Sequence, residues 1–210
     1  QRFYEAMCAG EPFARAPWGT AEEVEALDPD TVEQARLEIL KHGRVLIVAV
    51  GPIDRDPLLA ALRDWLGEGG AWGTKRPELP PSVVGQPAAL REVREEMPVD
   101  QARFHLGFRC PVPQGSEEME ALLLANSVLG GGIQGRLFRV VREERSLAYG
   151  IGSEVLAGKG LLTVSAGIDA RKAGEVRDEV LHQVADLAAH GPNAEELEMA
   201  KASFRNGLQA

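Results

Sequence analysis

The sequence predicts an α+β fold in which mixed, largely antiparallel sheets pack against helices. Three observations support this class: segments with helical apolar spacing, short segments that are β-branched or alternating, and consecutive strands close enough along the chain to pair. The chain has 210 residues, of which 44% are hydrophobic, so it can bury a substantial core.

The first third of the chain predicts two helices with a strand between them. Apolar residues recur on one helical face over Pro29–His42 and again over Asp54–Leu66. The continuous β-branched run Val45–Val50 predicts a strand buried on both faces. Glycine and proline then dominate residues 67–87, which indicates an extended linker and a domain boundary.

Beyond this boundary the sequence predicts strands and helices mixed along the chain. The expected strands cover 91–96, 102–110, 148–155 and 160–168, and the expected helices cover 117–129, 134–145, 170–190 and 194–208. A tight turn at 157–159 joins the last two strands into a hairpin. Asn193, followed three residues later by Glu196, predicts a capping box at the start of the last helix.

Composition excludes several classes of function. The balance of 23 basic and 32 acidic residues gives a net charge of -9, which argues against nucleic acid or an anionic membrane as a partner.

The apolar stretches are far shorter than the roughly 20 residues that span a bilayer, so we expect a cytoplasmic protein. The chain begins with Gln1 and has no signal peptide, so we expect a processed or cut piece. Cys8 and Cys110 are expected to be free thiols, because no C-x-x-C pair occurs.

The histidines do not predict a metal site. They are His42, His105, His182 and His190. The last two would be separated by about 12 Å of helical rise, too far to share one ion. An H-x-x-E-H or H-E-x-x-H pair is absent. We therefore assign no metal ligand and no catalytic residue, and we interpret the histidines as solvent-facing or core residues.

A glycine-rich segment follows the helix predicted over 117–129. Residues 130–135, beginning Gly130-Gly131-Gly132, fit the letters of the G-x-G-x-x-G dinucleotide fingerprint, and Glu154 follows about 20 residues later. That fingerprint requires a preceding strand, whereas Ser116 and the apolar spacing after it predict a helix. A helix C-cap leading into a loop is the favoured interpretation.

Four arginines recur every three residues along the next predicted helix: Arg136, Arg139, Arg142 and Arg145. A solvated helix face is the simplest interpretation. However, Tyr149 follows Arg142 by seven residues, where helix should give way to strand, so both polar groups could face one cleft. A guanidinium and a phenol hydroxyl together suit a peptide carbonyl or the oxyanion formed when it is attacked.

Four motifs in this region occur in a characteristic order. They are Leu129-Gly130-Gly131-Gly132, Arg136-Leu137-Phe138, Val141-Arg142-Glu143 and Ser146-Leu147-Ala148-Tyr149. Together they resemble the second homologous half of insulinase/pitrilysin-type zinc metallopeptidases, a family that includes mitochondrial processing peptidase. The resemblance extends over nearly the whole chain and is weakest in the predicted linker.

The resemblance implies a division of labour between two similar halves that close around a peptide. The first half carries zinc on an H-x-x-E-H helix, and the metal-free second half supplies the arginine and tyrosine that match Arg142 and Tyr149. Residues 1–75 would then be the C-terminal part of a first peptidase-like domain, 76–90 a linker, and 91–210 most of the second domain. No cofactor is expected in this chain; zinc is expected in an upstream domain or a partner.

One segment departs from the active members of the family. They commonly have His-Pro-Tyr-Gly where this chain has Glu11-Pro12-Phe13-Ala14, which resembles bacterial non-catalytic members. We therefore expect a chain that is inactive alone, binds peptide, and pairs with a zinc-bearing homologous domain or subunit. Two alternatives remain open: a structural or scaffolding homologue without peptide binding, and a fragment of a complete active zinc protease.

Overall fold

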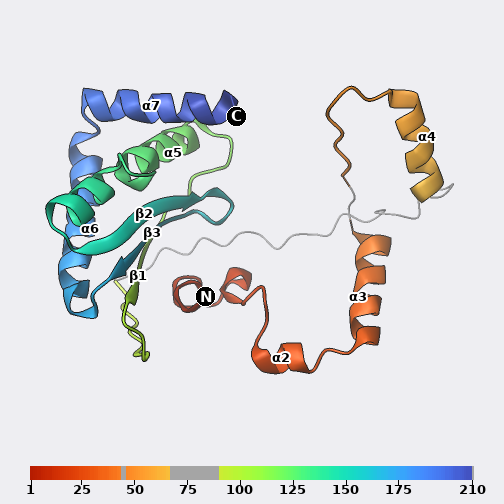
Figure 1. The fold of residues 1–210 in the computed structure, drawn as a ribbon, viewed down its shortest axis with the longest axis horizontal. Helices are drawn as coiled ribbons and strands as arrows, with labels where there is room; N and C mark the ends of the chain where they lie inside the picture. The colour runs from red at the N-terminus through yellow and green to blue at the C-terminus, as the bar shows by residue number, and fades with distance from the viewer. Residues whose placement is uncertain (44–45, 67–89, 210) are drawn as a thin grey trace. The chain divides into compact units, whose positions relative to one another are not determined.

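The computed structural model describes residues 1–43, 46–66 and 90–209 (Figure 1). Contacts divide the chain into two compact units: unit 1 is Gln1–Ala14 with Ser82–Ala210, and unit 2 is Arg15–Pro81. The linker predicted over 67–87 lies outside the described residues.

Unit 1 is built on a three-stranded antiparallel sheet. Strands β1 (Ala102–Arg109), β2 (Ala148–Leu156) and β3 (Leu161–Ile168) lie in the order β1-β3-β2. The predicted hairpin of β2 and β3 is confirmed, and a short 3₁₀ turn at Ala157–Lys159 joins its strands. The predicted α+β class is confirmed.

Helices cover one face of this sheet (Figure 1). They are α5 (Glu117–Gly130), α6 (Ala173–His190) and α7 (Ala194–Gln209), and α7 packs on α5. Alternate residues of β3 point toward the helices, because successive side chains of a strand lie on opposite faces. The buried core contains Leu129, Leu137, Val141, Leu147, Ile151, Leu162, Val164, Ala166, Ile168, Val176 and Val180.

The helix ends of unit 1 follow from local sequence. The Ser116 hydroxyl accepts the Met119 N–H at 3.2 Å, so α5 begins where its cap predicts. At α7, the Glu196 N–H donates to Asn193 and the Asn193 N–H donates to the Glu196 carboxylate, both at 2.9 Å. The predicted capping box is confirmed.

The N-terminal segment packs on the opposite face of the sheet. Helix α1 (Arg2–Met7) places the Phe3 ring against His105 of β1, with ring centroids 5.4 Å apart. Gly107 allows this approach, because a Cβ there would lie 2.7 Å from the Phe3 ring. Part of this face is therefore covered, and a hollow lined by Arg103 remains on another part of it.

Two strand predictions are wrong. Residues 46–50 of the predicted Val45–Val50 strand form no strand, and Leu46, Val48 and Val50 are 77, 74 and 90% exposed. The described residues of unit 2 contain no strand that could pair with this segment. A β-strand forms only where a neighbouring strand accepts and donates its backbone hydrogen bonds. Residues 91–96 also form no strand. Side-chain ion pairs, including Glu92 with Arg177 of α6, connect that segment to the rest of unit 1.

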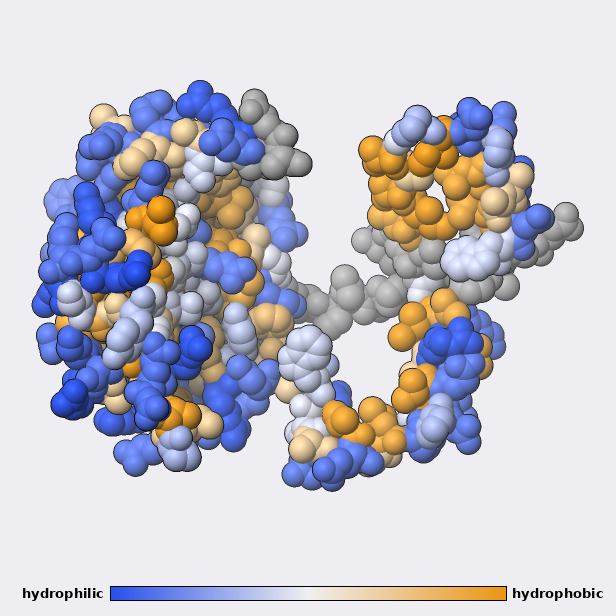
Figure 2. All heavy atoms as spheres, viewed as in Figure 1, coloured by the Kyte–Doolittle hydropathy of each residue, from blue (hydrophilic) through white to orange (hydrophobic). Residues whose placement is uncertain are grey.

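Unit 2 consists of separate helices. They are α2 (Ala21–Glu25), α3 (Pro29–His42) and α4 (Arg55–Leu66), and the bounds of α3 equal the prediction. No described residue of this unit is buried. Figure 2 shows hydrophobic atoms gathered at the surface over α3, α4 and the segment between them. Over the described ranges of the chain, no helix has both the length and the apolar character that crossing a membrane requires.

Candidate functional site

The backbone from Phe138 to Gly150 departs from regular structure three times in succession: in a π-helix, at a left-handed residue and at a β-bulge. Residues Phe138–Glu144 form a π-helix, in place of the α-helix expected there, and the Arg145 N–H donates to the carbonyl of Val140 at 3.0 Å. Ser146 then has a φ of 51°, a left-handed conformation that is uncommon for a residue with a side chain. Such irregularities often occur at functional sites, so this segment is the first place to look for one.

Tyr149 owes its orientation to a β-bulge. Ala148 pairs with Ile168 and Gly150 pairs with Gly167, so Tyr149 is an extra residue in β2 without a partner in β3. A bulge bends the strand and redirects the side chain of the extra residue. The Tyr149 side chain is accordingly 65% exposed.

Buried anchors support the irregular segment at both ends. Val141 is fully buried and Leu147 is 5% exposed, and the Leu147 N–H donates to the carbonyl of Val141 at 2.8 Å. These contacts join the segment to the core of unit 1. The exposed residues between the anchors are therefore attached to a packed framework.

The four arginines of this segment have different surroundings, so the solvated-face interpretation fails for the first. Arg136 is buried and donates twice to Glu196, at 2.7 and 2.8 Å, and once to Asp186 at 2.7 Å. Arg145 pairs with Glu179 of α6. Arg139 lies 3.7 Å from Glu196 and 3.9 Å from Glu144.

Arg142 differs from the other three. Its guanidinium lies over the Phe138 ring at 4.4 Å from the centroid, and no carboxylate among the described residues pairs with it. The side chain is exposed. Arg142 is therefore the arginine of this series whose hydrogen-bonding capacity the fold leaves unused.

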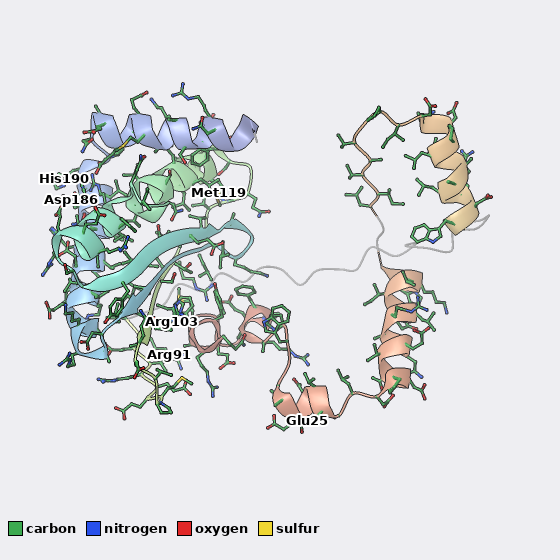
Figure 3. All side chains as sticks on the ribbon, in the orientation of Figure 1. Glu25, Arg91, Arg103, Met119, Asp186 and His190 are labelled. Carbon is green, nitrogen blue, oxygen red and sulfur yellow. The ribbon has the colours of Figure 1, made fainter. Side chains whose placement is uncertain are left out.

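The Arg136 cluster has the electrostatics of a structural ion-pair network. Hydrogen bonds from Arg136 lower the pKa of Glu196 despite its burial, and the same bonds raise the pKa of Arg136. Asp186 also has a lowered pKa, first through its hydrogen bond with His190, at 2.9 Å, and then through Arg136. Asp186 and His190 lie together near the C-terminal end of α6 (Figure 3).

A hollow of about 450 Å³ lies on the sheet face opposite the helices. Tyr149 lines one side of it, and Arg103 and His105 of β1 line the other. Arg142 does not line this hollow, and no described hydrogen bond or ring contact joins it to Tyr149. Tyr149 thus lies at the edge of a concave surface, whereas Arg142 is exposed on the π-helix and outside that surface.

The glycine-rich segment is a close-packed helix end. Gly130 is the last residue of α5, and a Cβ there would lie 2.6 Å from the Ser153 hydroxyl of β2. Gly131 is the C-cap, and Gly132 has a φ of 134°, which favours glycine. Helix α5 precedes this segment where a dinucleotide fingerprint needs a strand, so the C-cap interpretation is confirmed.

The histidines have ordinary surroundings. His42 lies 3.3 Å from Glu38, His182 is exposed on α6, and His105 stacks on Phe3. Desolvation is the main cause of the lowered pKa of His105, and the N-terminal charge and Arg103 contribute. Within the described ranges, no three His, Cys, Asp or Glu residues come together in a way that could hold a metal ion. The described residues therefore provide no set of ligands that fits a zinc site.

Sequence reasoning missed one ion pair on the open face of the sheet. Arg109 of β1, whose side chain is 4% exposed, donates to the Glu11 carboxylate at 2.5 and 3.2 Å. Arg109 also donates to the carbonyl of Met7 at 2.6 Å. Glu11 thereby fastens the N-terminal segment to the sheet. No sequence pattern signals a pair separated by 98 positions.

The fold and this arrangement are those of a protease-related domain in which the described residues form no metal centre. A family model described as "Peptidase M16 inactive domain" matches residues 26–204. The chain belongs to this family.

Curated relatives are similar over almost the whole chain. An uncharacterized zinc protease of Mycobacterium tuberculosis is 30% identical over 98% of this chain and 47% of its own length. A probable inactive metalloprotease of Bacillus subtilis is 24% identical, again over 98% of this chain and 47% of its own. The chain thus spans about half the length of the curated relatives it matches.

Solved structures show the same fold. The peptidase M16 inactive domain from Pseudomonas fluorescens has a TM-score of 0.77 and is 24% identical, with 99% of this chain and 51% of that chain covered. A protease from Helicobacter pylori has a TM-score of 0.78 at 15% identity, with 99% of this chain and 50% of that chain covered.

Proposed function

We propose that this chain is a zinc-free domain that binds a peptide main chain through Arg142 and Tyr149 and assists a zinc centre in another domain or subunit. The observation that carries the proposal is the unused guanidinium of Arg142, beside three arginines that the fold employs in ion pairs. Tyr149, in its bulge, presents a second donor at the open hollow.

The two side chains suit different parts of this task. Guanidinium donors bind an oxygen more strongly as it becomes negative, so Arg142 would contribute more to the transition state than to the bound peptide. The neutral Tyr149 hydroxyl would mainly orient the peptide carbonyl. Because binding that strengthens only in the transition state raises kcat, loss of Arg142 should lower kcat more than it raises KM.

The test uses this chain together with a homologous polypeptide that carries an H-x-x-E-H helix, and a quenched fluorescent peptide as substrate. Arg142→Ala should lower turnover by about 10²-fold, the effect of removing one oxyanion donor. Arg139→Ala is the matched control: it lies three residues earlier in the same π-helix and is 53% exposed. Unchanged turnover in Arg142→Ala, or an equal loss in Arg139→Ala, would refute the role given to Arg142.

A peptide-binding titration separates this function from scaffolding. The paired protein with its zinc removed should still bind the intact peptide, and Arg142→Ala should weaken that binding less than it weakens turnover. A scaffolding homologue would bind no peptide under any of these conditions.

A second candidate is that these residues form part of one complete active zinc protease. The similarity to the mycobacterial zinc protease, at 30% identity over 47% of its length, favours it. Under both candidates we propose that residues 1–75 belong to a first peptidase-like domain and 91–210 to a second. The gene sequence upstream of Gln1 is the first test of the second candidate, which requires an H-x-x-E-H motif there. Absence of that motif would refute the second candidate and would assign the zinc centre of the first candidate to a separate subunit. We also propose a cytoplasmic location, which cell fractionation tests.

A further inference from the structure

The hollow beside Tyr149 has a low floor between two taller sides. In the sheet register, Arg103 of β1 pairs with Gly167 of β3, which pairs with Gly150 of β2. This row therefore has a large side chain on β1 and glycine on β3 and β2. His105 pairs with Ser165 in the neighbouring row. Paired residues share one face of an antiparallel sheet, so Arg103 and His105 rise on the β1 side of this floor. The bulged Tyr149 bounds the other side.

The polar side chains that line this hollow can all donate hydrogen bonds. They are Gln101, Arg103, His105, Tyr149 and Ser165, and no aspartate or glutamate of the described ranges lines the hollow. This is notable in a chain with 32 acidic and 23 basic residues. The amide of Gln101 lies directly over Gly167, because a Cβ at Gly167 would be 2.8 Å from the Gln101 side-chain nitrogen.

Arg103 is a charged residue of this surface whose guanidinium has no partner among the described residues. Over the described part of the chain it takes part in no ion pair or hydrogen bond, and its side chain is exposed (Figure 3). Arg109, on the same strand and the same face, shows what happens where a carboxylate is available: it pairs with Glu11 and is almost fully buried. The hollow therefore offers an unpaired guanidinium surrounded by neutral donors.

We propose that this hollow binds a carboxylate of the bound peptide, with Arg103 as its charged partner and Gln101 and Ser165 as additional donors. A guanidinium fork matches the two oxygens of a carboxylate, and charge-assisted hydrogen bonds are about twice as strong as neutral ones. The carboxylate belongs either to an acidic side chain or to the peptide C-terminus. This inference rests on the proposed function, since Tyr149 binds the main chain of the same peptide.

Fluorescent nine-residue peptides that differ in one group test the proposal by polarization with the purified chain. One set has glutamate or glutamine at the centre with an amidated C-terminus, and the other has central glutamine with a free or amidated C-terminus. The peptide with the preferred carboxylate should bind about tenfold more tightly than its neutral counterpart. The set that shows this preference identifies the source of the carboxylate.

Variants then assign the preference to Arg103. Arg103→Gln should abolish the tenfold ratio and leave the affinity for the neutral peptide unchanged. Arg177→Gln removes the same charge from α6, on the helix side of the sheet, and should retain the ratio. Arg142→Ala should weaken all peptides alike and also retain it.

The possible failures are distinguishable. If neutral peptides bind but neither carboxylate is preferred, or if Arg103→Gln keeps the ratio, the carboxylate subsite is refuted and peptide binding stands. If no peptide binds to the purified chain or to the chain paired with its zinc-bearing homologue, the proposed function is refuted and this inference with it.

Discussion

Helices α3 of unit 2 and α5 of unit 1 have equally well capped starts, but among the described residues only unit 1 has buried side chains. In unit 2, the Asp28 carboxylate caps α3, yet Leu37 and Ile39 of that helix are 50 and 68% exposed. In unit 1, Ser116 caps α5 in the same way, and Leu129 of that helix is 2% exposed. Local signals suffice to start a helix, whereas burial requires a second apolar surface to pack against.

Removal of the buried ion pair should reveal the largest difference between the units. Arg136→Gln should reduce the opening free energy of β3 amides by about 3 kcal/mol, because the buried Glu196 loses its hydrogen-bonded charged partner and keeps only the more distant Arg139. Arg36→Gln removes the exposed pair with Glu33 in α3 and should leave the exchange of α3 amides unchanged within error. Native-state hydrogen exchange measures both, and equal effects in the two units would contradict the comparison.

A matched pair of leucine truncations should give the next largest difference. Leu129→Ala should cost unit 1 about 3 kcal/mol, because it leaves a cavity in the core. Leu37→Ala makes the same chemical change on the exposed α3 and should cost less than about 0.5 kcal/mol. Urea titration followed by hydrogen exchange in each unit checks the two values; a loss of about 3 kcal/mol at Leu37 would show that α3 packs on a surface in solution.

Removal of the helix caps should give the smallest change in stability. The local loss of helix should be larger in unit 2 than in unit 1. Asn193→Ala should lower the free energy of unfolding of unit 1 by about 1 kcal/mol. Helix α7 should nevertheless stay helical, because its residue Ala200 is buried and holds it against the rest of the unit. Asp28→Ala should unwind the first turn of α3, because no buried residue supports it. Cα chemical shifts of the two first turns report the result. A first turn of α3 that stays helical in Asp28→Ala would disprove this dependence on the cap.

Helix ends were predictable because their causes lie within a few residues. The Asn193–Glu196 capping box and the exact bounds of α3 follow from side chains that reach the nearest backbone groups. The strand predicted at Val45–Val50 fails for the opposite reason. A strand depends on a partner elsewhere in the chain, and apolar β-branched composition does not supply one.

The sequence indicates residues for the candidate site but not the geometry around them. The seven-residue spacing and the family resemblance indicate Arg142 and Tyr149. The π-helix beneath Arg142 and the bulge at Tyr149 depend on how the chain meets β3 and the core, so no periodicity reveals them. The spacing of the four arginines likewise predicts one solvated face, although Arg136 is buried against Glu196, 60 positions away.

The sequence by itself determined the α+β class, the capped helix ends, the hairpin and the family, because these depend on local side-chain chemistry and on motif order. Only the tertiary structure decided which arginines are ion-paired, that Glu11 fastens the N-terminal segment to Arg109, and that the surface beside Tyr149 is hollow and lined by donors. The physical reason is that ion pairs and surface shape arise between residues far apart in the chain. Their energy is set by burial and distance, which the linear order does not contain.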